Sequence, residues 1–288
     1  MKIFNLIKEK AGFKKKIDTL LASRQPANIQ EAFHLLAKQG MSNDLKKYLL
    51  DTYPTYCLEF GFKMFQQYFE NLKEWDLEDK KVFYLPKNIN NLKYLERLLI
   101  NRNPINTFPI NIGSLQNLKK LFTSGNEIQT IPKSFSKLRR LESLFLSGTL
   151  LDNIPSEILT LNNLYELTIS YAKITEIPID IHQLVGLQYL RLNNNVIIEI
   201  TDGIYKLKNL KTLNLSNNQI TEIHPEISGM GALHELDLSD NKIEKLPQDI
   251  AYLPMLQELN LEGNPISKKE KANIKHHFRN VTTTIYFD

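Results

Sequence analysis

The chain has 288 residues, with 36 lysines and arginines against 32 aspartates and glutamates, and its formal net charge at pH 7 is +4. This small excess excludes the strongly basic composition with which a protein attracts nucleic acid, so no nucleic-acid partner is expected. Hydrophobic residues make up 42% of the chain, which is enough to build a core, and the one cysteine, Cys57, excludes an internal disulfide.

The first segment, residues 2–20, mixes lysines with apolar residues. It predicts part of a helical cap or a frayed tail, and a basic amphipathic helix that touches an anionic membrane surface is the alternative. The apolar stretch at residues 3–7 is shorter than a secretory signal peptide requires, and no apolar run is long enough to predict a membrane-spanning helix. We therefore expect no integral membrane contact and a cytoplasmic location, while export without a signal peptide stays open.

Residues 1–71 hold no repeat, and their apolar periodicity predicts a helical N-terminal cap. One helix is expected to begin at Asn28, because Glu31 completes a capping-box pattern, and to end at Gly40. A second is expected over about residues 43–52, and a third, rich in aromatic residues, over about residues 55–69.

A repeat of 23 residues occupies residues 72–266 without insertion or deletion. The clearest unit begins at Leu233 and has the pattern LxxLxLxxNxIxxLPxxIxxLxx. One such unit is too short to bury its own apolar residues, so the units must stack into a solenoid with a continuous core. The nine units open at Leu72, Leu95, Leu118, Leu141, Leu164, Leu187, Leu210, Leu233 and Leu256.

This pattern resembles the leucine-rich repeat family, in the 23-residue short type found in intracellular scaffolds, such as the Ras-suppressor-like repeats, and in bacterial proteins. The resemblance covers residues 72–266. It implies an α/β solenoid, shaped as a horseshoe with a parallel sheet on the concave side and short helical turns on the convex side. It also implies a scaffold or adaptor that binds a protein partner on the concave face.

Counting from the opening leucine, the fourth and sixth places are apolar and alternate with polar residues, which predicts a strand. The ninth place holds asparagine in six units, where its side chain can satisfy backbone groups inside a turn. Lys80, Thr149 and Ala172 replace that asparagine, so we expect the asparagine ladder to be weakest around residues 149–172. The prolines that follow, such as Pro132, are expected outside the sheet because they lack an amide hydrogen.

Residues 267–288 predict a C-terminal cap that covers the end of the stack. Ser267 and Glu270 form a capping-box pattern at the start of a helix. Residues 281–287, rich in threonine and isoleucine, predict a last strand that closes the sheet.

The candidate binding residues lie on the predicted inner face, where nothing in the core requires large apolar side chains. The fifth places of three consecutive units hold Leu99, Phe122 and Phe145, and Tyr171, Tyr189 and Arg191 follow in the next two units. Contiguous exposed aromatic residues often mark a protein-binding site, so we expect these six residues to contact the partner. Two alternatives are that the phenylalanines shield one another and that they contact the N-terminal cap. Both ends of this face are predicted to be acidic.

No catalytic, cofactor-binding or metal-binding residues are predicted, and the protein is not expected to be an enzyme. His276 and His277 are adjacent on a helix and point in different directions, so they do not form a ligand pair. Two functional alternatives remain open. Residues 1–71 could hold a ligand site of their own, which a pocket lined by polar groups would support. The protein could instead be a secreted or surface-associated adhesion or effector protein that binds a host protein or glycan.

Overall fold

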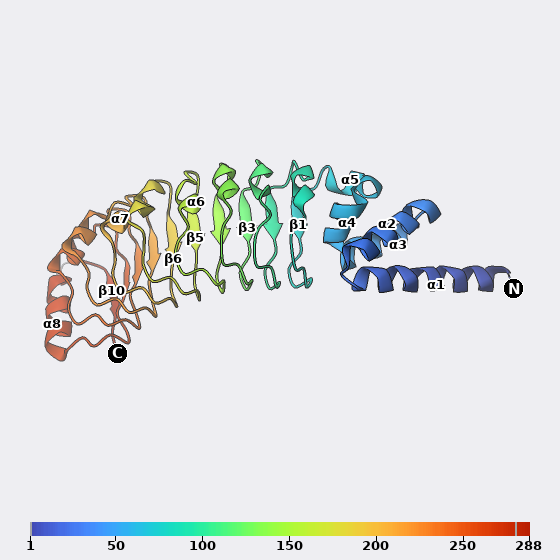
Figure 1. Cartoon of the computed structure of the whole chain (residues 1–288). Helices are drawn as coiled ribbons and strands as arrows, with labels where there is room; N and C mark the ends of the chain where they lie inside the picture. The colour runs from blue at the N-terminus through green and yellow to red at the C-terminus, as the bar shows by residue number, and fades with distance from the viewer. Residues whose placement is uncertain (1, 280) are drawn as a thin grey trace.

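The computed structural model describes residues 2–279 and 281–288, with side chains described from residue 11 onward except at residue 280. Within these residues the chain forms one ten-stranded sheet in which the strands follow one another in sequence order. Figure 1 shows the strands side by side along a gentle arc, with short helices along its outer edge and a group of helices at the N-terminal end. The predicted α/β solenoid with a helical N-terminal cap is confirmed.

Helices α1 (Lys2–Ala22), α2 (Pro26–Gln39), α3 (Asn43–Thr52), α4 (Pro54–Gly61), η1 (Phe62–Met64) and α5 (Gln66–Phe69) form the N-terminal cap, and α1 extends away from the repeats (Figure 1). Within the described part of the chain, no helix combines the length and the apolar composition needed to cross a membrane. The side chains of residues 1–10, which carry half of the predicted membrane-touching helix, lie outside the described residues.

In the cap, the predicted end of α2 at Gly40 and the predicted bounds of α3 are right, whereas the predicted start of α2 and the single helix predicted over residues 55–69 are wrong. Helix α3 begins after Ser42, whose hydroxyl accepts a hydrogen bond from the Leu45 amide. Helix α2 begins at Pro26 and not at Asn28, because a proline fits the first turn, where an amide hydrogen is not needed. The single helix expected over residues 55–69 is divided into α4, η1 and α5.

The ten strands are short and pair in parallel, and each residue pairs with the one 23 places later through β1–β9, as Leu98 pairs with Leu121. The central residue of each strand faces the core, and Trp75, which starts this column, is 2% exposed. The residues on either side of it face outward on the open, inner face of the sheet. The strands are β1 (Glu74–Asp76), β2 (Arg97–Leu99), β3 (Lys120–Phe122), β4 (Ser143–Phe145), β5 (Glu166–Thr168), β6 (Tyr189–Arg191), β7 (Thr212–Asn214), β8 (Glu235–Asp237), β9 (Glu258–Asn260) and β10 (Thr284–Tyr286).

Short helical turns return the chain along the outer edge of the arc. Pro132, Pro155, Pro178 and Pro247 each lie immediately before such a turn in extended backbone, outside the sheet as predicted. The turns are η2 (Lys87–Asn91), η3 (Ile112–Ser114), η4 (Lys133–Lys137), α6 (Ser156–Leu159), η5 (Ile179–Gln183), α7 (Asp202–Tyr205), η6 (Pro225–Gly229) and η7 (Gln248–Tyr252).

The asparagines of the ninth place tie each repeat to its neighbours. Asn195 donates from Nδ2 to the carbonyls of Ile169 and Leu192, at 2.7 and 2.9 Å, and its Oδ1 accepts from the Ile174 amide at 3.1 Å. The same three bonds recur at the other five asparagines of the column, such as Asn218. These side chains are therefore structural, as the sequence predicts.

Of the three repeats that lack the asparagine, the two that hold Thr149 and Ala172 are adjacent and interrupt the asparagine ladder within the stack. Thr149 keeps only the bond from its hydroxyl to the Leu146 carbonyl, at 2.8 Å. Ala172 has no polar side-chain atom. The backbone amide of the buried Leu151 therefore lacks the side-chain acceptor that an asparagine at position 172 would provide, as Asn195 does for the Ile174 amide. The two affected turns are adjacent, and they follow β4 and β5.

The C-terminal cap consists of α8 (Lys268–His277) and β10. The Ser267 hydroxyl accepts a hydrogen bond from the Glu270 amide at 3.2 Å, which confirms the predicted cap of this helix. Strand β10 pairs in parallel with β9 and ends the sheet.

Candidate functional site

An apolar row, consisting of Leu99, Phe122 and Phe145, crosses the open face of the sheet. These residues are direct partners in the registers of β2, β3 and β4, so the predicted adjacency is present. The rings of Phe122 and Phe145 stack with centroids 4.7 Å apart and an interplanar angle of 7°. All three side chains are half-buried, so the two rings shield each other in part and still present apolar surface to solvent.

Two hydroxyl groups lie beside the apolar row without a hydrogen-bond partner among the described residues. Ser143 on β4 is 1% exposed and Thr168 on β5 is 9% exposed, although both belong to the open face. Thr168 is the register partner of Phe145 on one side and of Arg191 on the other. A buried hydroxyl without a partner is costly, and both oxygens are covered by their neighbours, so a ligand would not reach them without a movement of neighbouring side chains.

Tyr189 and Arg191 form a second group on β6. The Arg191 guanidinium pairs with the Glu166 carboxylate at 2.9 Å and lies 5.8 Å from the centroid of the Tyr189 ring. Tyr189 also meets the Tyr165 ring edge-to-face, with centroids 6.2 Å apart. Strand β5 separates this group from the apolar row, and Thr168 connects the two.

Tyr171 does not share the sheet face with the other predicted residues. It lies in the turn after β5, is 66% exposed, and its backbone has a φ of 54°, in the left-handed region. The equivalent place of every other repeat also has positive φ, at Asp79, Arg102, Gly125, Gly148, Asn194, Asn217, Asp240 and Gly263. Tyr171 is the only aromatic residue at this place, where a bulky side chain strains the backbone.

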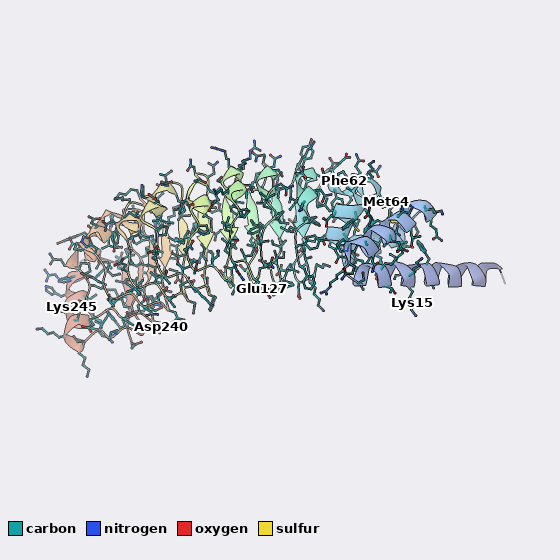
Figure 2. The ribbon with its side chains drawn as sticks, in the orientation of Figure 1. Lys15, Phe62, Met64, Glu127, Asp240 and Lys245 are labelled. Atoms are coloured by element: carbon teal, nitrogen blue, oxygen red, sulfur yellow. The ribbon has the colours of Figure 1, made fainter. Side chains whose placement is uncertain are left out.

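Tyr171 is accompanied by exposed apolar residues that the sequence analysis missed. Leu150, Val196 and Ile198 are 43%, 37% and 58% exposed and lie in the turns before and after that of Tyr171. We call these four the rim residues. Tyr171 holds the same place in its repeat as Asp240, and Leu150 and Val196 hold the place of Glu127. Figure 2 labels Asp240 and Glu127 along the lower edge of the solenoid. The signal was present in the sequence, because the tenth place of the repeat holds leucine or valine only at 150 and 196.

The charge distribution along the open face differs from the expected one. The acidic first repeat is neutralised only in part, because Glu74 pairs with Arg97 and Glu78 pairs with Arg102, whereas Asp76 and Asp79 form no ion pair in the described residues. At the other end, Glu235, Asp237 and Glu258 line a hollow of about 210 Å³, and no ion pair involving them is found in the described residues. Ion pairing between repeats thus reduces the negative charge at one of the two ends that were expected to be acidic.

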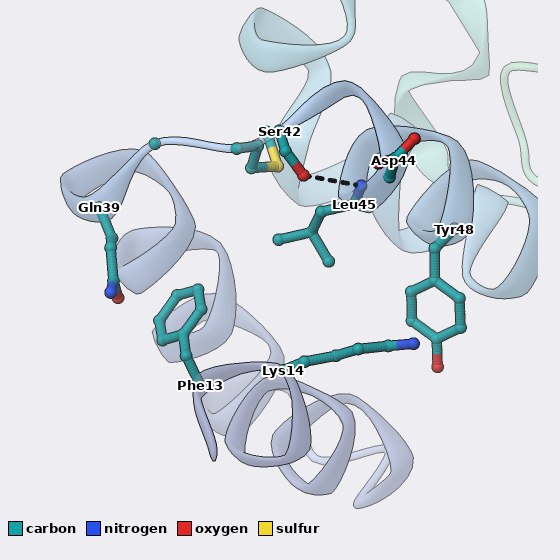
Figure 3. A pocket seen from close by; sticks show the side chains of 9 residues that line it. Phe13, Lys14, Gln39, Ser42, Asp44, Leu45 and Tyr48 are labelled. Atoms are coloured by element: carbon teal, nitrogen blue, oxygen red, sulfur yellow. Dashed lines mark hydrogen bonds between the residues drawn. The ribbon is translucent and has the colours of Figure 1, made fainter. Parts of the chain in front are cut away.

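The N-terminal cap contains a separate pocket of about 550 Å³ between α1, the end of α2 and the start of α3 (Figure 3). Its lining is mixed, with Phe13 and Leu45 beside Lys14 and Asp44. The Lys14 ammonium lies 3.8 Å from the centroid of the Tyr48 ring, and the Tyr48 hydroxyl donates to Asp18 at 2.8 Å. Partial burial and this bond raise the pKa of Tyr48 to about 12, so Tyr48 stays protonated at neutral pH and cannot act as a base.

Other reactive groups are also inert or dispersed. Burial raises the pKa of the Cys57 thiol, which is fully buried in the cap and therefore a poor nucleophile. Among the described residues, no group of three histidine, cysteine or carboxylate side chains is placed to hold a metal ion. The chemistry that the geometry offers is apolar contact and hydrogen bonding on the open face and its rim.

Comparisons with known proteins agree with this architecture. Models described as leucine rich repeat match residues 93–151 and 208–266, and a model of two leucine rich repeat copies matches residues 185–229. A comparison with curated protein sequences gave no match.

Three solved structures illustrate the likeness. A leucine-rich repeat protein of Leptospira interrogans is 36% identical, with a TM-score of 0.73 over 76% of this chain and 55% of that one. The plant peptide hormone receptor RGFR1, in complex with RGF2, is 28% identical, with a TM-score of 0.61 over 76% of this chain and 39% of that one. Internalin C2 of Listeria monocytogenes, at 21% identity, shares the fold with a TM-score of 0.55 over 77% of this chain and 84% of that one. The chain thus spans about half of the first protein and less of the second.

Proposed function

Because the chain is a leucine-rich repeat protein, we propose that it acts as a scaffold or adaptor that binds another protein on the open, concave face between β2 and β6. The observation that carries this proposal is the apolar row of Leu99, Phe122 and Phe145 on the open face, with its stacked phenylalanine rings. A face that needed only solubility would hold polar side chains there, as the fifth places of β7, β8 and β9 do with Asn214, Asp237 and Asn260.

Each part of the surface has its own role in the proposed complex. Phe122 and Phe145 provide the apolar anchor, since half-buried rings lose their remaining water on contact with little loss of side-chain entropy. Arg191 is fixed by Glu166, so it offers its free donors at a defined position.

An extended segment of the partner is the ligand form that best suits this surface. The apolar row runs across the strands and spans three of them, about 10 Å at the usual spacing of parallel strands. The likeness to a plant peptide hormone receptor in complex with RGF2 supports a peptide as the ligand. We propose that the rim residues then contact the partner beyond this segment.

The proposal is tested by affinity capture from a native lysate, followed by quantitative mass spectrometry. Four baits are compared: wild type, Phe122→Ala/Phe145→Ala, Tyr171→Asn and Tyr252→Asn. Tyr252 is the matched control, because it is 66% exposed like Tyr171 but lies in η7 on the outer edge. We expect a partner that wild type and Tyr252→Asn capture equally and that the double variant loses. Equal capture by the double variant, or equal loss with Tyr252→Asn, would contradict the proposal.

A further inference from the structure

A second cleft, of about 300 Å³, lies where the helical cap meets the first repeat. Its walls come from the end of α1, the junction of α3 and α4, and the loop of residues 80–84 after β1. The cap is fixed to the repeat beside it, because the Asn88 side chain donates to the Leu58 carbonyl at 2.6 Å. The walls of the cleft are therefore held in place by both parts of the protein.

Three cationic side chains line this cleft, Arg24, Lys80 and Lys81. In the part of the chain that the structure describes, none of the three forms an ion pair or a side-chain hydrogen bond. Three arginines of the repeats differ, since Arg97 and Arg191 on the open face and Arg102 in the turn after β2 are all paired with glutamates. Lys80 occupies the ninth place of its repeat, which holds an asparagine in six other repeats. Here the lysine side chain lines the cleft.

Arg24 is held in a fixed position without an acidic partner. Its guanidinium lies 3.9 Å from the centroid of the Phe83 ring, and its backbone has a φ of 58° directly after α1. A guanidinium that stacks on a ring keeps its N–H donors free in its own plane, in the fork that matches two oxygens of one anion. Lys81, with a φ of 55°, is likewise placed by the loop.

Aromatic rings form the remaining wall. Tyr53 and Tyr56 stack with centroids 6.0 Å apart at 9°, and Tyr84 meets Tyr56 at 6.4 Å. The nearby Glu59 carboxylate accepts a hydrogen bond from the Tyr84 hydroxyl at 2.6 Å, which occupies one of its oxygens. The cleft thus combines three unpaired positive charges with flat apolar surfaces.

We propose that this cleft binds a phosphate monoester carried on an aromatic group. The Arg24 fork binds two phosphate oxygens, Lys80 and Lys81 neutralise the remaining charge, and the aromatic group packs against the tyrosine wall. A doubly charged phosphate suits three cations better than a single carboxylate does. This site is separate from the open face of the sheet, so it does not depend on the function proposed for that face.

The test is calorimetric titration of the full chain at about 0.15 M salt, where exposed charges are largely screened beyond about 8 Å. The probes are phenyl phosphate, inorganic phosphate and phenol. Arg24→Lys keeps the charge and removes the fork, and Lys80→Gln/Lys81→Gln removes two charges. Lys133→Gln is the matched control, an exposed lysine on the outer turn η4 without an ion pair in the described residues. Unchanged fluorescence of Trp75, the only tryptophan, verifies that each variant is folded.

We expect saturable binding of phenyl phosphate, weakened about tenfold in each cleft variant because charged hydrogen bonds are lost, and unchanged in Lys133→Gln. Tighter binding of phenyl phosphate than of inorganic phosphate would support the aromatic wall. Equal binding of the two phosphates would support a phosphate site and reject the aromatic part. The site itself is overturned if neither phosphate saturates, if phenol binds as well as phenyl phosphate, or if Lys133→Gln weakens binding as much as the cleft variants.

Discussion

Phe122 and Phe145 lie at the same place in consecutive repeats, and their rings are stacked 4.7 Å apart on the solvent side of the sheet. This contact has two consequences, one for the stability of the free protein and one for binding. Stacking removes part of each ring from water, which stabilises the free protein, and it leaves one flat apolar surface for a partner. Substitution of either ring is therefore expected to affect folding as well as binding.

We predict that Phe122 and Phe145 are energetically coupled in the free protein. An aromatic pair of this geometry contributes about 0.5–1.5 kcal/mol beyond the burial of its area. Urea unfolding of Phe122→Ala, Phe145→Ala and the double variant should give a coupling energy in that range. A Leu99→Ala and Phe145→Ala pair, two strands apart, serves as the uncoupled control. Strictly additive effects of the two phenylalanine substitutions would show that the rings do not stack in solution.

Tyr171→Asn is predicted to stabilise the protein while it weakens partner capture. A left-handed backbone costs a residue with a large side chain roughly 1–2 kcal/mol, and asparagine tolerates it better. The free energy of unfolding should rise by about 1 kcal/mol, as measured in urea. Tyr252→Asn, at a position with ordinary φ and the same exposed fraction of 66%, should give no such gain. A loss of stability on Tyr171→Asn would mean that the tyrosine is held by contacts that outweigh its strain.

Completing the asparagine ladder is predicted to stabilise the fifth repeat. In Ala172→Asn the new amide can donate to backbone carbonyls and accept from the Leu151 amide, which should add about 1 kcal/mol. The converse change, Asn195→Ala, removes the acceptor of the Ile174 amide and two donations, and should cost roughly 1–3 kcal/mol or more. Chemical denaturation of both variants measures the difference. If Ala172→Asn were destabilising, the turn after β5 would have to lack room for the larger side chain.

The helical cap is predicted to lose stability at alkaline pH. The pKa of Tyr48 rises from 10.0 to about 12 in the folded chain, through partial burial and the hydrogen bond to Asp18. Above pH 10 the unfolded chain releases this proton while the folded chain keeps it, so the stability is fully present below pH 10 and is lost as the pH rises through 12. Burial also raises the pKa values of Tyr53 and Tyr56, which adds to the decline.

Urea midpoints at rising pH, followed by the fluorescence of Trp75 beside the Phe69 ring, measure this loss. In Tyr48→Phe the slope of stability against pH should be smaller, because one of the groups that titrate on unfolding is absent. An unchanged slope in that variant would show that Tyr48 does not contribute.

The repeat allowed most of the fold to be predicted, because a constant step of 23 residues determines the strands, their register and the buried columns together. The cap was harder to predict, since its packing has no period. At Gly61, where α4 ends, an added Cβ would lie 2.5 Å from the Phe33 ring, a close approach that no pattern reveals.

The candidate site was predicted only in part. The adjacency of Leu99, Phe122 and Phe145 follows from the register, and the separate position of Tyr171 could have been inferred from the small or polar residues that mostly fill its column. The burial of the Ser143 and Thr168 hydroxyls could not be inferred from the sequence, because it depends on the conformations of the neighbouring side chains. Pairing of Glu74 with Arg97 was visible in principle, since both hold the third place of adjacent repeats.

The unbroken register also sets a rule for the spacing of contacts in a bound segment. Adjacent parallel strands lie about 4.8 Å apart, whereas an extended peptide that crosses them advances about 3.3 Å per residue. Three peptide residues therefore cover about the same distance as two strands. The side chains of an extended peptide alternate in direction, so only every second residue faces the sheet, and a residue that faces the sheet recurs at the same position over a strand after about six residues, or four strand spacings. A ligand segment should accordingly repeat its contact residues in steps of about six, with the residues that point away from the sheet free to vary.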